Sequence, residues 1–169
     1  MRIFLRVVLY LALVVWLGAE LFFPIVAAIT FNVLISDTHT AGLIVGLLLR
    51  ILHAMGLFSG VVAMVVLAFM PSFRGYRPKS VLAPMLLLLL MIALTAYSQY
   101  GIIPAMERDR IAAGGAIDAV PPGNPNRVHF NRLHNRSTIV EEGVVLFGLV
   151  TVCLVAWAET RNLDPKPAA

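Results

Sequence analysis

Four long runs of apolar residues divide the chain, and shorter polar segments separate them. The runs cover residues 7–28, 51–70, 81–103 and 140–157. About 20 apolar residues in a helix cross a bilayer core of about 30 Å, so each run is long enough to span a membrane. The pattern therefore predicts an all-α fold, an integral membrane four-helix bundle, with residues 1–169 forming a single domain.

The first run has features of a signal peptide. Arg2 and Arg6 precede it, and the small residues at 26–28 mimic a cleavage site. The run is nevertheless longer than the apolar segment of a typical signal, and it contains Glu20 and Pro24. We expect it to be retained as the first membrane helix.

The composition agrees with a lipid-covered protein. Hydrophobic residues make up 60% of the chain and charged residues 13%, about half of the roughly 25% found in soluble domains. The single cysteine, Cys153, excludes a disulfide or a Cys-based metal cluster within one chain. The basic residues do not alternate with aromatic ones as nucleic-acid-binding segments do, so we expect no nucleic-acid partner.

The distribution of Arg and Lys predicts the orientation. Arg2 and Arg6 precede the first run, Arg161 and Lys166 follow the last, and the segment between the second and third runs adds Arg74, Arg77 and Lys79. Because cytoplasmic flanks are enriched in Arg and Lys, we expect a multi-pass protein of the cell (inner) membrane with both termini in the cytoplasm. The predicted loop 107–126 and its flank oppose this with Arg108, Arg110, Arg127, Arg132 and Arg136, without reversing it.

Two helices are expected to begin before their apolar runs. Asp37 or Thr38 can cap the second helix, and Asn126 can cap the fourth. The polar stretch FNRLHNRST, residues 130–138, would then form the first turns of the fourth helix, at or above the lipid headgroups.

Small residues mark a packing face on the second helix. Gly42 with Gly46, and Gly56 with Gly60, have the GxxxG spacing that lets helix backbones approach closely in membranes. His53 lies seven residues from both Gly46 and Gly60, so we expect it to point toward another helix.

Polar residues gather toward one end of the predicted bundle. They are Glu20, Arg50, Gln99, Ser137, Thr138 and Glu141. Ionisable groups within a membrane are costly and are functional candidates by default. A pair between Arg50 and Glu20 or Glu141 would lower that cost. The alternatives are a structural network that holds the helices in register and a functional site.

His53 and His134 are candidate ligands of haem or a metal ion. Both fall on stripes predicted to face inward, and two histidines from facing helices can bind haem b iron or copper. The alternative is that each is a hydrogen-bonded packing residue.

Three functions remain open. The first is an accessory or scaffold bundle, or a small-ligand-binding protein, within a homo-oligomer or a larger membrane complex. The second is a haem or copper protein that uses His53 and His134, and the third is an oligomeric transporter component. Neither a phosphate-binding loop nor an HExxH motif occurs, and no nucleophile has an evident His–acid partner, so a non-enzymatic function is favoured.

Four motifs carry a family resemblance: WLGAELFFPIVA (16–27), LRILHAMGL (49–57), TAYSQYGIIPAME (95–107) and FNRLHNRST. The chain resembles the transmembrane protein 205-like family, a four-span membrane domain of unknown function. In layout alone it is distantly similar to small membrane proteins of the CopD and HemJ kind. That likeness implies copper handling or haem-dependent porphyrin oxidation.

Overall fold

The computed structural model describes residues 2–72 and 78–163. Its helices are α1 (Arg2–Val33), α2 (Thr38–Phe69), α3 (Pro78–Tyr97), α4 (Ile103–Ala112) and α5 (Pro125–Leu163). A π-helical turn, η2 (Ser98–Ile102), joins α3 to α4 in one continuous rod, and η1 (Met70–Ser72) and η3 (Ile117–Ala119) are short 3₁₀ turns. No strand occurs in the described ranges, and the predicted all-α four-helix bundle is confirmed.

Four helical stretches are long and apolar enough to cross a membrane. They are Ile3–Val33, Thr38–Ser72, Lys79–Ala112 and Pro125–Thr160, of 31 to 36 residues each. At a rise of 1.5 Å per residue such helices are about 46–54 Å long, whereas the hydrocarbon core is about 30 Å thick. The protein is therefore a multi-pass membrane protein whose helices continue past the bilayer core, as expected for the second and fourth.

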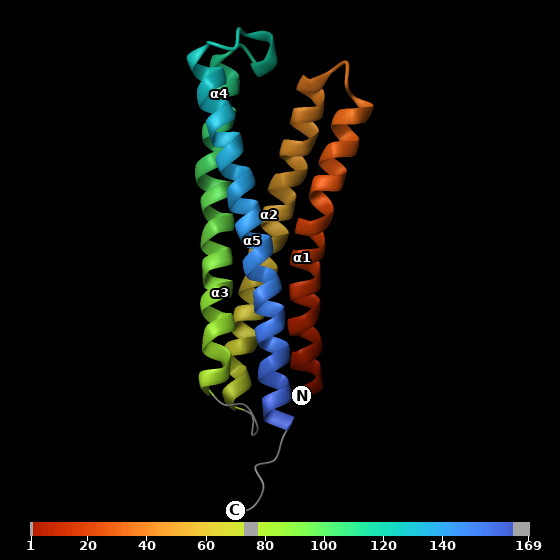
Figure 1. The fold of residues 1–169 in the computed structure, drawn as a ribbon, viewed down its shortest axis with the longest axis vertical. Coiled ribbons are helices and arrows are strands. Elements are labelled where there is room, and N and C mark those ends of the chain that lie inside the picture. The colour runs from red at the N-terminus through yellow and green to blue at the C-terminus, as the bar shows by residue number, and fades with distance from the viewer. Residues whose placement is uncertain (1, 73–77, 164–169) are drawn as a thin grey trace, which may run out of the picture.

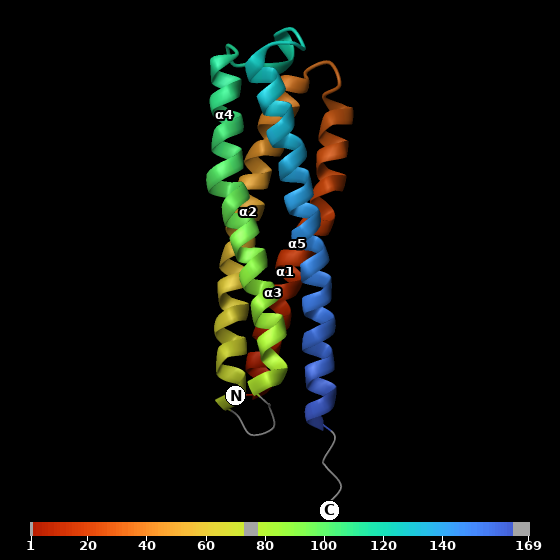
Figure 2. The same ribbon diagram turned by 60° about the vertical axis from the view of Figure 1, so that its left-hand side comes forward.

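The helices pack as a ring of antiparallel neighbours. α1 packs on α2, α2 on α3, and α3 on α5, and a narrower contact between α5 and α1 closes the ring. We call the end that holds the start of α1 and the end of α5 the terminal end, and the opposite end, with turn 34–37 and segment 113–124, the loop end (Figures 1 and 2). The predicted loop at 107–126 is shorter in the structure, because α4 continues to Ala112.

The hydrophobic core occupies the terminal half of the bundle. It is formed by the first half of α1, the second half of α2, residues 81–91 of α3 and the second half of α5, and it includes Leu13, Leu67, Leu88, Met91 and Val144. Toward the loop end the helices separate into two arms, residues 21–50 of α1 and α2 and residues 103–136 of α4 and α5 (Figure 1). No residue from 21 to 37 or from 42 to 51 is buried.

The close packing of α1 on α2 centres on one aromatic ring. Trp16 on α1 is 1% exposed and lies against two glycines of α2. A Cβ atom added to Gly56 would lie 2.5 Å from its Nε1, and one added to Gly60 would lie 2.5 Å from its Cζ3. These two glycines match the expected packing face.

The other predicted glycine pair does not pack. A Cβ atom added to Gly42 or Gly46 would meet no atom within 4 Å. This pair thus makes no close helix contact within the chain, because both glycines lie in the arm formed by α1 and α2, where no third helix covers this part of α2.

The helix starts follow ordinary capping chemistry. Asp37 caps α2, as expected, because its Oδ1 accepts a hydrogen bond of 2.9 Å from the backbone amide of Thr40. Hydrogen bonds from the side chain and backbone of Thr40 hold the pKa of Asp37 below its usual value. α5 begins earlier than expected. Asn124, rather than Asn126, supplies the cap, since its Oδ1 accepts from the Asn126 amide at 2.9 Å and Pro125 takes the first helical position.

A polar contact joins α1 to α5 at the terminal end. Arg6 Nε lies 3.1 Å from Glu159 Oε1, and the Tyr10 hydroxyl donates to Glu159 Oε2 at 2.8 Å. We call this contact the clasp. It fixes the start of α1 against the end of α5, although the contact between these two helices is narrow elsewhere.

The packing of Trp16 predicts opposite effects for two glycine substitutions on the same helix. Gly60→Ala places a methyl group against the indole ring and against Ile92 Cγ1 at 2.8 Å, and should destabilise the fold by about 1–3 kcal/mol. Gly46→Ala meets open space and should leave stability unchanged or raise it by up to about 1 kcal/mol, because alanine favours the helix. Unfolding of the purified protein in mixed micelles, with increasing dodecyl sulfate, measures both. Equal stability of the two variants would contradict this account of the packing.

Candidate functional site

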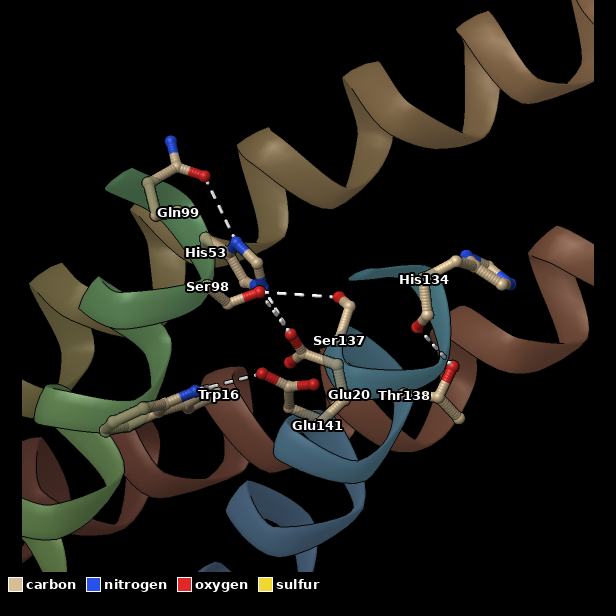
Figure 3. A network of polar contacts seen from close by, with 9 residues as sticks. All are labelled: Trp16, Glu20, His53, Ser98, Gln99, His134, Ser137, Thr138 and Glu141. Atoms are coloured by element: carbon tan, nitrogen blue, oxygen red, sulfur yellow. Dashed lines mark hydrogen bonds and ion pairs between the residues drawn. The ribbon is translucent and has the colours of Figure 1, made fainter. Parts of the chain in front are cut away.

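His53 lies at the level where the two arms begin to separate, and its side chain is fully buried. Its Nδ1 is 3.1 Å from Gln99 Oε1, and its Nε2 is 2.8 Å from Glu141 Oε1 (Figure 3). Three elements, α2, η2 and α5, are thus joined through one imidazole ring. Both ring nitrogens thus face oxygen atoms, and a ring protonated at both nitrogens can donate a hydrogen bond to each of them.

Glu141 is the most connected acid of the site. Its Oε1 also accepts a hydrogen bond of 3.0 Å from the Ser98 hydroxyl, and Ser98 Oγ lies 3.4 Å from Ser137 Oγ. Its Oε2 is buried without a hydrogen-bond partner among the described residues. One oxygen of this carboxyl group therefore has hydrogen-bond partners, and the other has none among the described residues.

A second carboxyl group, from α1, faces the first. Glu20 is 3% exposed and lies next to Glu141. Its Oε1 accepts a hydrogen bond of 3.3 Å from Trp16 Nε1. The same indole that packs on the α2 glycines thus orients Glu20, and the site combines two carboxyl groups with one imidazole. We call Glu20, His53, Ser98, Gln99, Ser137 and Glu141 the polar cluster.

The π-helical turn brings two neighbouring residues into the cluster. In an α-helix, successive side chains point about 100° apart, yet Ser98 and Gln99 both reach it. The turn contains an i→i−5 hydrogen bond from the Ile103 amide to the Ser98 carbonyl. Pro104 explains it, because proline has no N–H and its ring would clash with the Tyr100 carbonyl four residues earlier. Widening the preceding turn relieves that clash, and such turns are frequent at functional sites.

Ser98 is the one member of the cluster that the sequence analysis did not include. Its partners come from α5, 39 and 43 residues away, so no local motif could reveal them. The available signal was the combination of Gly101 and Pro104 within a membrane span, which is typical of an interrupted helix.

His134, the second candidate ligand of haem or a metal ion, does not share the buried site of His53 (Figure 3). His134 and Thr138 are exposed, and the Thr138 hydroxyl donates to the His134 carbonyl of its own helix at 3.2 Å. The buried stripe of α5 passes through Leu133 and Ser137. His134 and Thr138 each follow a member of that stripe by one residue and are therefore turned about 100° away from it. The expectation that they face inward is wrong.

Ligand binding by His53 alone is also disfavoured by its contacts. Both ring nitrogens are within hydrogen-bonding distance of an oxygen atom, so iron or copper would have to displace one of these two contacts. No group of three or more His, Cys, Asp or Glu residues suited to a metal ion occurs in the part of the chain that the structure describes.

Arg50 lies outside the polar cluster. Its side chain is exposed, and in the described ranges no ion pair joins it to Glu20 or Glu141. It lies instead within electrostatic reach of Glu107 on α4, which is paired with Arg110. The predicted neutralisation of the buried acids by Arg50 is therefore replaced by the contact between His53 and Glu141.

The contact with His53 predicts unequal effects at two adjacent glutamates. Glu141→Ala leaves His53 Nε2 and the Ser98 hydroxyl buried without their acceptor, and should cost about 1–3 kcal/mol of stability. Glu142→Ala, at an exposed neighbour on the same helix turn, should change stability by no more than about 0.5 kcal/mol. The same mixed-micelle unfolding measures both variants, and a cost at Glu142 equal to that at Glu141 would contradict the assignment.

Comparison with known protein families matches residues 11–111 to a domain of unknown function, DUF4149. The matched range runs from α1 to α4 and includes Trp16, Glu20, His53 and Gln99. Neither a curated protein nor a solved structure matches the chain. Because the match covers more than half of the sequence, the chain belongs to the DUF4149 family.

Proposed function

We propose that this protein is a non-enzymatic membrane bundle that binds and releases a proton at the carboxyl pair of Glu20 and Glu141. The observation that carries the proposal is the buried Oε2 of Glu141, which has no hydrogen-bond donor among the residues that the structure describes and lies beside the carboxyl group of Glu20 (Figure 3). Two adjacent carboxylates repel each other in a medium of low dielectric, so a shared proton is the arrangement with the lowest energy.

The charge balance of the polar cluster supports one bound proton. With His53 as imidazolium and both glutamates ionised, the cluster carries one net negative charge inside the bundle. A proton on the carboxyl pair makes the cluster neutral, which removes the cost of an uncompensated charge within a membrane. It also supplies the missing donor between Glu141 and Glu20.

The bound proton would couple two helices. Glu20 comes from α1 and Glu141 from α5, and these helices share only a narrow contact elsewhere. A protonated pair is joined by a hydrogen bond, and an ionised pair is pushed apart. The contact between α1 and α5 thus depends on the pH at the site, which suits an accessory bundle whose association with a partner or small ligand is controlled by protons.

Gln99 is suited to follow the proton state of His53. The amide presents its oxygen to Nδ1 when the ring is an imidazolium, and it can present its NH₂ group when Nδ1 is unprotonated. A side chain that satisfies both states keeps the buried ring hydrogen-bonded throughout. No metal or haem is required for this function.

Other features of the proposal rest on the sequence. The Arg and Lys residues that flank the spans favour both termini in the cytoplasm and insertion in the cell (inner) membrane. We also propose kinship with the transmembrane protein 205-like family, on the motifs at 16–27, 49–57 and 95–107. A homo-oligomer or a larger complex remains the proposed setting, whereas the histidine pair that favoured haem or copper is lost with the exposure of His134.

Infrared difference spectroscopy tests the proton site directly. A step from acidic to alkaline pH on reconstituted protein should remove the C=O stretching band of a buried protonated carboxyl group. The band should be absent from Glu20→Gln and from Glu141→Gln, because each variant breaks the pair.

Glu142→Gln is the matched control and should keep the band, since Glu142 is exposed on the same turn of α5. The proposal fails if the wild-type protein shows no carboxyl band that responds to pH, or if the band survives in both Glu20→Gln and Glu141→Gln.

A further inference from the structure

The arm formed by α4 and α5 carries an excess of positive charge. Residues 103–136, which form this arm and the segment between its helices, include five arginines, three acidic residues and no lysine. Each acid has a basic partner on the same arm: Glu107 with Arg110, Asp109 with His129, and Asp118 with Arg127. Among the residues that the structure describes, no acidic partner is present for the other three arginines, Arg108, Arg132 and Arg136.

Two of these arginines are neighbours on one flank of α5. Arg132 and Arg136 are four residues apart and both exposed, so their Cβ atoms lie about 5–6 Å from each other. Their flank faces the rod of α3 and α4. His129, three residues before Arg132, contacts Asp109 at 2.7 Å, and Arg136 Nη1 donates to the Tyr97 hydroxyl at 3.3 Å. Like charges at this spacing repel each other, and an anion held between them would remove that repulsion.

The nearest carboxyl groups are engaged elsewhere or point elsewhere. Asp109 contacts His129, and Glu141 contacts His53 in the polar cluster. Glu142 is exposed, but it follows Arg136 by six residues and is therefore turned about 120° away from it. The two guanidinium groups are thus available to an anion from outside the chain.

The arginine pair lies close to one boundary of the hydrocarbon core. Residues 139–158 of α5 are uncharged apart from Glu141 and Glu142, and these 20 residues extend over about 30 Å, the thickness of that core. Arg136 precedes this stretch by less than one helical turn. Tyr97 and Tyr100 are 46% and 72% exposed, as is typical of aromatic residues at the membrane interface. Phosphate groups of lipids occupy this level.

Below Arg136 the same flank of α5 is apolar. Val140, Gly143 and Phe147 follow it by four, seven and eleven residues. A Cβ atom added to Gly143 would have no neighbour closer than Leu94 Cδ1, at 3.8 Å. A lipid whose headgroup meets the arginines can therefore lay its acyl chains along the flank without contact with a charged side chain.

We infer that Arg132 and Arg136 form a binding site for the phosphate group of an anionic phospholipid. A guanidinium group presents a planar fork of N–H donors that matches the oxygen atoms of a phosphate, and two such groups at this spacing can share one phosphate. The hydrogen bond to Tyr97 holds Arg136 toward α3. A zwitterionic lipid fits less well, because the cationic amine of its headgroup already compensates the phosphate.

This lipid site is separate from the proton site and does not rest on it. The arginines of this arm count against the predicted orientation, in which the loop end lies outside the cytoplasm. A bound anionic headgroup gives them a function on either side of the membrane.

Native mass spectrometry of the delipidated protein in a neutral detergent tests the site. Dioleoyl phosphatidylglycerol and dioleoyl phosphatidylcholine share their acyl chains, so their affinities differ only through the headgroup. The wild-type protein should bind the phosphatidylglycerol several-fold more tightly. Arg132→Gln and Arg136→Gln should each weaken that binding about three- to fivefold, the share of one arginine near a lipid surface, and leave phosphatidylcholine binding unchanged.

Arg50→Gln is the matched control for the loss of one charge. Arg50 is exposed near the same end of the bundle, but it lies on α2 and within electrostatic reach of Glu107, so its removal should keep the preference for phosphatidylglycerol. An equal loss in Arg50→Gln would indicate a general attraction to positive charge. That result, or equal affinities of the wild-type protein for the two lipids, overturns the inference.

Inorganic phosphate distinguishes a lipid from a free anion. A large excess of inorganic phosphate should leave the phosphatidylglycerol bound, because the free anion lacks the acyl chains that lie against the flank. Displacement of the lipid by inorganic phosphate would assign the two arginines to a soluble anion and overturn the lipid site. Mixed-micelle unfolding verifies that the variants are folded, since substitutions of exposed side chains should leave stability unchanged within about 0.5 kcal/mol.

Discussion

Ionisable groups inside an apolar bundle must be paired, and the contact between His53 and Glu141 meets that requirement here. The distance of 2.8 Å between Nε2 and Oε1 joins α2 to α5, which are not consecutive in the chain. The neighbouring hydrogen bonds depend on this pair, because Ser98 donates to the same carboxylate oxygen and Gln99 completes the imidazole. Without the pair, two charges would be buried singly, which costs far more than a missing apolar contact.

Several features of the sequence serve this one contact. Trp16 fits against α2 because residues 56 and 60 have no side chain, and the ring so positioned donates to Glu20. Pro104 lies outside the polar cluster, yet the widened turn that accommodates it directs Ser98 and Gln99 to the same side of the rod. Sequence analysis treats these glycines and this proline as signals of packing or of an interrupted helix. In the structure they also help to orient polar side chains that come from four different elements.

The features that the sequence predicted well are those in which hydrophobicity decides the outcome. Four apolar runs became four long helices, Asp37 caps α2, and Glu20, His53, Gln99, Ser137 and Glu141 lie together. The features that it missed depend on where helices separate. His134 and Gly46 have spacings that fit an inward face, but periodicity describes one helix and not the presence of a neighbour. Both lie in the arms, where no opposing helix surface is present. Ser98 was missed because a π turn, which hydrophobic periodicity does not indicate, brings it to its partners on α5.

The clasp between Arg6 and Glu159 gives α1 the geometry of a lever. Glu20 lies about 21 Å along the helix from that contact, and Val33 about 20 Å farther, at 1.5 Å per residue. A rigid helix pivoting at the clasp would therefore double, at its far end, any displacement that arises beside Glu141. A shift of a few tenths of an ångström between two oxygen atoms would thus become a shift of about 0.5–1 Å at the turn of residues 34–37.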